Sequence, residues 1–169
     1  VLLTFMFKSC DLMLAFIRAR TTSQSVIDIF NWLHNLLGIQ TFCTMFPVIL
    51  TDNGSEFSNP IALELDGEGL RRTSIFSCDP RASFQQPTVA FNPEFIRKIL
   101  PKGRSFEKLI QDDIDLIMSH INSYSRAKLN DKSPFEMFSF IDGQGILEKL
   151  GQRIIPSNEI ILKPLLLRK

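Results

Sequence analysis

A short apolar run, Val48–Leu50, leads directly into the polar sequence Thr51-Asp52-Asn53-Gly54, and this junction constrains the fold more than any other feature. A brief run of this kind is typical of a strand that is buried on both faces of a sheet. Open α/β sheets place ligand sites just beyond the carboxyl ends of such strands. A carboxylate held there, that of Asp52, can bind a hard cation such as Mg²⁺ through oxygen. Asn-Gly is also a strong hairpin-turn signal, so on spacing alone the favoured role of Asp52 is to cap a turn.

The order of the remaining elements predicts an α/β fold. Residues 1–7 and 12–18 predict an antiparallel hairpin. A helix over about residues 23–37 follows, with Thr22 or Ser23 as its N-cap and Gly38 after its end. Residues 73–76 predict another strand, and most of the later half has helical periodicity. We therefore expect a mixed sheet with flanking helices and residues 48–50 at its centre. The ribonuclease H-like fold fits this order, as do other α/β folds.

Composition is ordinary for a soluble globular protein, with 44% hydrophobic and 22% charged residues among 169. Three widely spaced cysteines exclude a zinc ribbon and argue against a secreted disulfide framework, so we expect a cytoplasmic protein. Lys8 and Asp11 break the apolar N-terminal stretch into two runs, each of which is too short to span a bilayer. Residues 1–70 carry three basic and seven acidic side chains, and residues 71–169 carry sixteen and eleven. Any nucleic-acid contact is therefore expected on the second half.

Several segments resemble, in order, those of DDE-type transposases of the insertion-sequence thirty family. Residues 51–57, TDNGSEF, are similar to the segment that carries the second catalytic Asp of integrase-like transposases. Three later segments agree with the family: Cys78-Asp79-Pro80 with Ser83 and Gln85, then Glu94-Phe95-Ile96-Arg97 with Leu100-Pro101-Lys102-Gly103, then Asn122, Arg126, Lys128 and Leu129 with Ser133-Pro134-Phe135-Glu136-Met137-Phe138. The resemblance covers about residues 1–140 as a partial catalytic core and leaves 141–169 as a C-terminal tail.

The resemblance implies a ribonuclease H-like core in which three carboxylates hold two Mg²⁺ or Mn²⁺ ions for DNA strand cleavage and transfer. Asp52 takes the place of the second carboxylate. The first Asp of the family lies on a strand that precedes Val1, so we expect the chain to be a fragment without its first strand. The family Glu lies seven residues before the helix Arg, here Arg97, and that position holds Ala90.

The neighbourhood of Ala90 also departs from the family. Pro93 disfavours a helix that extends back past it, so we expect the helix to start near Asn92 and to leave residue 90 outside. Glu94 is the nearest replacement carboxylate and possible metal ligand, although an acidic residue is also favoured at a helix N-terminus. We therefore predict a truncated and degenerate transposase that is inactive and binds Mg²⁺ or Mn²⁺ without a tight site.

The expected partners are DNA, in the form of transposon ends, and an intact transposase or a second copy of the chain. An unpaired strand edge beside residues 1–7 favours self-association. Four basic residues are candidates for phosphate contact, although a solvated face explains them almost equally well: Arg97, Lys102, Arg126 and Lys128. The alternative function is a noncatalytic module that binds DNA or a transposase.

Overall fold

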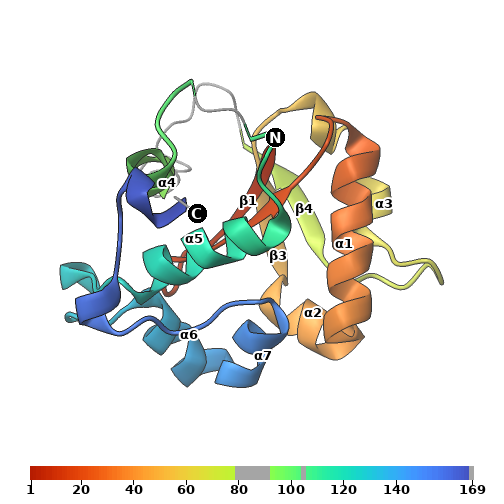
Figure 1. The fold of residues 1–169 in the computed structure, drawn as a ribbon. Coiled ribbons are helices and arrows are strands. Elements are labelled where there is room, and N and C mark those ends of the chain that lie inside the picture. Colours follow the sequence, from red (N-terminus) through yellow and green to blue (C-terminus); the bar gives the residue numbers. More distant parts are fainter. Residues whose placement is uncertain (79–91, 104–105, 168–169) are drawn as a thin grey trace. The chain divides into compact units, whose positions relative to one another are not determined.

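The structure, a computed structural model, describes residues 1–78, 92–103 and 106–167. The chain forms two compact units (Figure 1). Unit 1 comprises Val1 and Arg18–Pro87, and unit 2 comprises Leu2–Ile17 and Thr88–Lys169. Each unit combines helices with two strands, which confirms the predicted α/β class.

Unit 2 begins with the predicted antiparallel hairpin. Strand β1 (Leu2–Phe7) pairs with β2 (Leu12–Ile17) from Leu2↔Ile17 to Phe7↔Leu12. Asp11 in the connecting turn has a φ of 57°, and its buried carboxylate forms an ion pair with Lys128. Residues 12–16 of β2 are all buried. The hairpin therefore supplies the base of the unit 2 core.

Helix α5 (Gln111–Ser123) packs against β2 (Figure 1). Two of its side chains also bond the outer edge of that strand. The Asn122 carboxamide accepts the Met13 N–H at 2.9 Å and donates to the Met13 carbonyl at 2.7 Å. The Gln111 carboxamide accepts the Ile17 N–H at 2.9 Å and donates to the Ala15 carbonyl at 3.0 Å. Two side chains thus take the place of a neighbouring strand and satisfy backbone groups that would otherwise cost free energy when buried.

The remaining helices of unit 2 match their sequence signals. Helix α4 (Asn92–Ile99) starts at the predicted residue. Helix α6 (Pro134–Asp142) begins with a capping box, in which the Ser133 hydroxyl accepts the Glu136 N–H and Glu136 accepts the Ser133 N–H. Helix α7 (Gln144–Lys149) follows. Residues buried in the core come from β2, α4 and its end, and α5: Met13, Ala15, Ile99, Leu100, Ile114, Ile117, Met118 and Ile121.

The C-terminal tail follows the polar side chains of α5. The Arg153 N–H donates to the Ser119 hydroxyl, the Ile155 N–H to the Ser123 hydroxyl, and the Ile161 N–H to His120 Nδ1. A last 3-10 turn, η5 (Pro164–Leu167), contacts α4. In the structure the tail is therefore part of unit 2.

Unit 1 begins with α1 (Ser23–Leu37), whose bounds agree with the prediction. The Thr22 hydroxyl accepts the Ser25 N–H as N-cap, and Gly38 follows at a φ of 79°. Gly38 also precedes a short helix, α2 (Ile39–Met45). The helices bury Phe30, Leu33 and Phe42 among other apolar residues.

The sheet of unit 1 differs from the prediction. Strand β3 (Val48–Thr51) pairs in parallel with β4 (Ser74–Ser77), and the connection contains a 3-10 turn, η1 (Ser55–Phe57), and α3 (Pro60–Glu64). The expectation of a buried central strand is wrong, because Val48 is 55% and Leu50 41% exposed. Apolar residues favour burial of a strand, but a strand is buried on both faces only where other strands or helices cover it. Within the described residues the strands form two separate pairs, where a single mixed sheet was expected.

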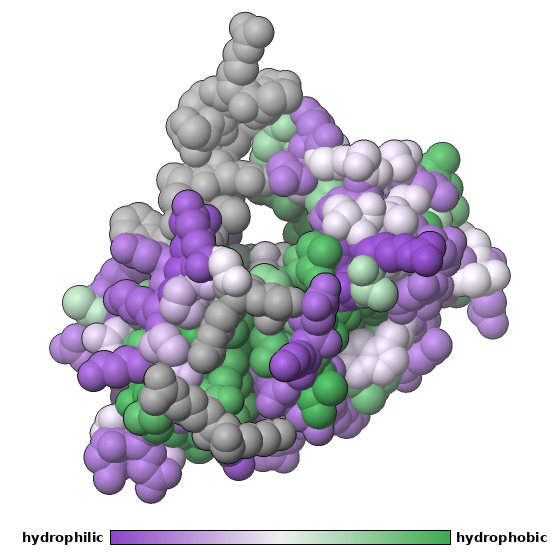
Figure 2. Space-filling view, turned by 45° about the horizontal axis from the view of Figure 1, so that its top comes forward, coloured by the Kyte–Doolittle hydropathy of each residue, from purple (hydrophilic) through white to green (hydrophobic). Residues whose placement is uncertain are grey.

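Exposed apolar side chains occur on several elements. Figure 2 shows hydrophobic patches between hydrophilic areas on the face that it draws. In unit 1 they include Val48, Leu50 and Phe76, which the strand register places on the same face of the β3–β4 pair. No helix in the described part of the chain is long and apolar enough to cross a membrane.

Candidate functional site

Asp52 lies immediately after β3, at the carboxyl end of the parallel pair, as the sequence predicted. Its side chain is exposed, and Oδ1 accepts the Gly54 N–H at 3.1 Å. A Cβ atom on Gly54 would lie 2.9 Å from this oxygen, so glycine leaves the space that the carboxylate occupies. Asp52 therefore caps a turn, as the spacing favoured. The turn does not close a hairpin, because the strand that pairs with β3 is parallel to it.

Glu56, the other carboxylate of the TDNGSEF segment, forms an ion pair within unit 1. Its Oε1 lies 3.0 Å from Arg18 Nη2, and the Arg18 side chain is only 2% exposed. Arg18 also donates to the Ser25 hydroxyl at the start of α1. A buried guanidinium that loses its anionic partner is strongly destabilising, so Glu56 cannot turn toward a metal ion without a cost to folding. The sequence analysis did not find this pair, which joins residues 38 positions apart.

Among the carboxylates in the described parts of the chain, Asp52 and Glu94 belong to different units. No group of three or more His, Cys, Asp or Glu side chains in these parts is placed to hold a metal ion. Glu94 is exposed in the first turn of α4, which belongs to unit 2. Ala90, the position of the expected family Glu, lies outside the described residues.

The four basic candidates fall into two groups, both in unit 2. Lys128 pairs with the buried Asp11 carboxylate. Arg126 donates to the carbonyls of Ile121 and Tyr124, and burial holds the pKa of its guanidinium below the ordinary arginine value. Arg97 and Lys102 are exposed, on the last turn of α4 and just after it, and neither forms an ion pair with a described residue. The second group is therefore free to meet phosphate, whereas the first stabilises the fold.

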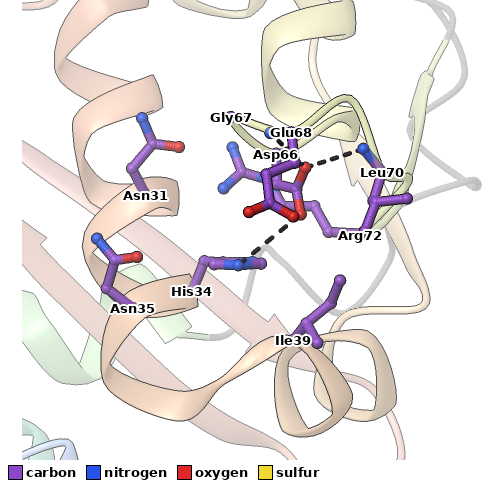
Figure 3. Close-up of a pocket in the computed structure, with 9 residues that line it drawn as sticks. All are labelled: Asn31, His34, Asn35, Ile39, Asp66, Gly67, Glu68, Leu70 and Arg72. Atoms are coloured by element: carbon purple, nitrogen blue, oxygen red, sulfur yellow. Dashed lines mark hydrogen bonds and ion pairs between the residues drawn. The ribbon is translucent and has the colours of Figure 1, made fainter.

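Unit 1 also contains an open pocket of about 490 Å³ between α1 and the segment before β4 (Figure 3). Asp66 organises this segment, because its Oδ1 accepts the N–H groups of Glu68 and Leu70 at 2.9 Å. These bonds, that from Leu70 first, lower the pKa of the Asp66 carboxyl, and His34 Nε2 lies 4.0 Å from its other oxygen. The remaining lining residues are Asn31, Asn35, Ile39, Gly67 and Arg72.

Arg72, one of the residues that line this pocket, is almost fully buried. Its guanidinium lies 5.8 and 5.6 Å from the ring centres of Phe30 and Phe42 and donates to the carbonyls of Ala62 and Leu63. Only 2% of the residue is exposed, and desolvation by burial lowers the pKa of the guanidinium. Asp66 and Arg72 thus join the segment to α1, α2 and α3, and the sequence analysis identified neither role.

Comparison with known proteins adds one relationship. No protein-family profile matches the chain. Over 90 residues, which are 53% of the chain, it is 34% identical to a protein of Spiroplasma virus SpV1-R8A2 B named "Putative integrase ORF3". The matched segment is 27% of that viral protein, so the chain spans only about a quarter of its length. The chain is thus similar in part to a protein named as an integrase.

Proposed function

We propose that this chain is part of a DNA integration and recombination protein, and that its core is related to DDE-type transposases of the insertion-sequence thirty family. The observation that carries the proposal is the similarity to the viral protein named as an integrase. The place of the TDNGSEF segment supports it, because Asp52 follows a strand of a parallel pair, where α/β proteins hold reactive groups. DNA is the partner that this proposal implies.

We further propose that this chain binds DNA without cleaving it. Three features support the loss of cleavage: Asp52 caps its own turn, Glu56 neutralises a buried arginine, and alanine occupies position 90. Metal-assisted phosphodiester chemistry needs two divalent ions held at fixed geometry, and a displacement of about 1 Å can lower the rate roughly a hundredfold. DNA binding needs only exposed cations, which Arg97 and Lys102 provide on and next to α4.

A paired assay tests both parts of the proposal. Binding of the full chain to a labelled duplex is measured by fluorescence anisotropy, and nicking of supercoiled plasmid is measured with Mg²⁺ and with Mn²⁺. We expect salt-dependent binding and no nicking above the level of the Asp52→Asn variant. Metal-dependent nicking that Asp52→Asn abolishes would show a complete active site. A chain that binds no DNA would contradict the integration role itself.

The Ala90→Glu variant sharpens the second part. If position 90 lies outside α4, which begins at Asn92, a new carboxylate there has no fixed direction. In a chain extended by the strand that carries the first family Asp, we expect Ala90→Glu alone to remain inactive in the nicking assay. Reversion of Pro93 should extend the helix back over position 90, and reversion of Gln86 and Pro87 should rebuild the loop before it. Nicking by the single variant would show that one substitution alone had removed the activity.

The alternative, a noncatalytic module that binds a transposase or a second copy of the chain, is favoured by the exposed face of the β3–β4 pair. Val48, Leu50 and Phe76 offer apolar surface on one face of a sheet whose edge at β3 pairs with no other strand among the described residues. Sedimentation velocity of the wild-type chain and of Leu50→Lys tests it. A concentration-dependent dimer that Leu50→Lys dissociates would support the module, and a monomer at all concentrations would count against self-association.

A further inference from the structure

A cluster of aromatic and cationic side chains lies where α4 meets the end of α5 in unit 2. The Arg126 guanidinium lies 4.2 Å from the ring centre of Phe95 and 5.2 Å from that of Tyr124. The two rings are 5.8 Å apart and inclined by 53°. Lys98 Nζ lies 4.9 Å from the Phe95 ring centre. We call these four residues the aromatic–cation cluster.

Hydrogen bonds of Arg126 attach the cluster to the C-terminal end of α5. Arg126 Nη1 donates to the Tyr124 carbonyl at 2.9 Å and Nη2 to the Ile121 carbonyl at 3.1 Å, so the guanidinium caps the C-terminal end of α5. A cation over an aromatic ring is attracted by the negative face of the ring, and two rings here share one guanidinium. Tyr124 therefore packs against the Arg126 guanidinium and the Phe95 ring.

Tyr124 nevertheless remains 44% exposed. A helix-capping role for Arg126 needs an aromatic neighbour, but it does not need a tyrosine ring that is left open to solvent. Lys98, whose ammonium group lies over the Phe95 ring, is exposed. Arg97 on α4 and Lys102 just after it are exposed too, and none of the three forms an ion pair with a described residue. The surface thus joins an open aromatic ring to the Lys98 ammonium group, which has no ion-pair partner among the described residues.

We propose that the aromatic–cation cluster binds single-stranded DNA, with an unpaired base stacked on Tyr124 and the adjoining phosphates on Lys98 and its basic neighbours. Stacking platforms beside cationic grooves are how proteins hold single strands without reading sequence. A paired base keeps its faces inside the duplex, so the ring has a use only for a strand that has opened or an end that has frayed. This inference rests on the proposed DNA integration role and assigns to it a second mode of DNA contact.

Anisotropy titrations of the full chain test the inference. The probe is a labelled single-stranded oligonucleotide of mixed sequence, about 15 nucleotides long, and the comparison is the same sequence as a duplex. We expect Tyr124→Ala to weaken single-strand binding about 5- to 100-fold and Tyr124→Phe to keep it, because stacking needs the ring and not the hydroxyl. Lys98→Gln should lower the slope of log affinity against log salt by about 0.7 on the single strand.

Two controls separate stacking from folding. Trp32→Leu removes a comparably exposed aromatic ring, 47% exposed on α1 of unit 1, and should leave single-strand binding unchanged. Tyr124→Leu retains apolar cover over Arg126 without an aromatic face, so it should fold like the wild type in thermal melts and still bind poorly. If Tyr124→Ala lowers stability, the affinity of Tyr124→Leu for the single strand tests the stacking role of Tyr124 instead.

The outcomes distinguish this inference from the proposed function. Equal losses on single strand and duplex, or no loss on either, would overturn the stacking role of Tyr124. Binding to duplex alone would also overturn it, while the integration role would stand. A wild-type chain that binds neither form of DNA would contradict both.

Discussion

The hairpin of unit 2 and the parallel pair of unit 1 are both two-stranded, but the backbone groups at their outer edges have different hydrogen-bond partners. In unit 2, the Asn122 and Gln111 carboxamides occupy the outer edge of β2. In unit 1, Glu64 accepts the Ile75 N–H and so occupies part of the outer edge of β4. Val48 and Leu50 of β3 make no backbone hydrogen bond away from β4 with any described residue.

The difference lies between β2, whose outer edge is bonded by side chains of α5, and β3, whose outer edge has no backbone partner among the described residues. Buried backbone groups must find partners, and α5 supplies them to β2 from its own side chains. An unpaired, apolar strand edge is a template for another strand. Asp52 follows directly after the open strand, so the residue with the clearest family resemblance lies on the less enclosed sheet.

The largest expected difference in the free energy of unfolding comes from placing a lysine on each pair of strands. Leu14 of β2 is 1% exposed and Leu50 of β3 is 41% exposed. Leu14→Lys buries an unpaired ammonium group and should lower the free energy of unfolding by about 4 kcal/mol or more. Leu50→Lys should change it by no more than about 0.5 kcal/mol. Urea denaturation measures both, and similar losses in the two variants would show that β3 is as enclosed as β2.

A smaller loss of stability is expected when a side chain that bonds the edge of β2 is removed. Asn122 is fully buried, and its carboxamide bonds both polar groups of Met13 and also donates to Gln152 Oε1. Asn122→Ala leaves these groups unsatisfied and should cost about 2–4 kcal/mol. Gln111→Ala is the matched control, because Gln111 makes the same kind of contact from a less buried position, and about 1 kcal/mol is expected. A loss of under about 0.5 kcal/mol for Asn122→Ala would mean that the edge is not sealed in this way.

The smallest effect should come from pH. His120 Nδ1 accepts the Ile161 N–H, so this nitrogen carries no proton in the folded state. Burial, and next the positive charge of Arg153, lower the pKa of His120 from its ordinary 6.5. The unfolded chain therefore binds the proton more readily, and stability is lost as the pH falls below about 6.5. Melting temperatures between about pH 7.5 and 5.5 should fall less for His120→Asn than for the wild type. Parallel curves would assign the change to other groups.

Local signals predicted the elements well, because each depends on residues that are close in the chain. The Thr22 cap and the Gly38 end of α1 lie at their predicted positions. The hairpin is also as predicted, since two apolar runs with a polar turn between them leave few other pairings. Asp52 as a turn cap followed from its own spacing to Gly54.

What the sequence did not reveal depends on residues that are far apart. Arg18 meets Glu56 across 38 positions, His120 meets Ile161 across 41, and Asn122 meets Met13 across 109. The periodicity of a sequence does not predict contacts between residues so far apart in the chain. Asn122 and Arg126 therefore entered as parts of a family pattern, although in this structure both hold the fold together. The burial of β3 was predicted wrongly for a related reason, since apolar residues do not show whether neighbouring strands are present.

Manganese titration by calorimetry tests the central claim most directly, namely that the Asp52 site cannot assemble a metal clamp. The wild-type chain, Asp52→Asn and Glu94→Gln are compared at equal concentration. Because Asp52 is bound to its own turn and Glu56 to Arg18, we expect only weak binding, the same in all three proteins. A tight, stoichiometric site in the wild type that Asp52→Asn abolishes would contradict the account. If Glu94→Gln abolished it too, Glu94 would be the missing ligand.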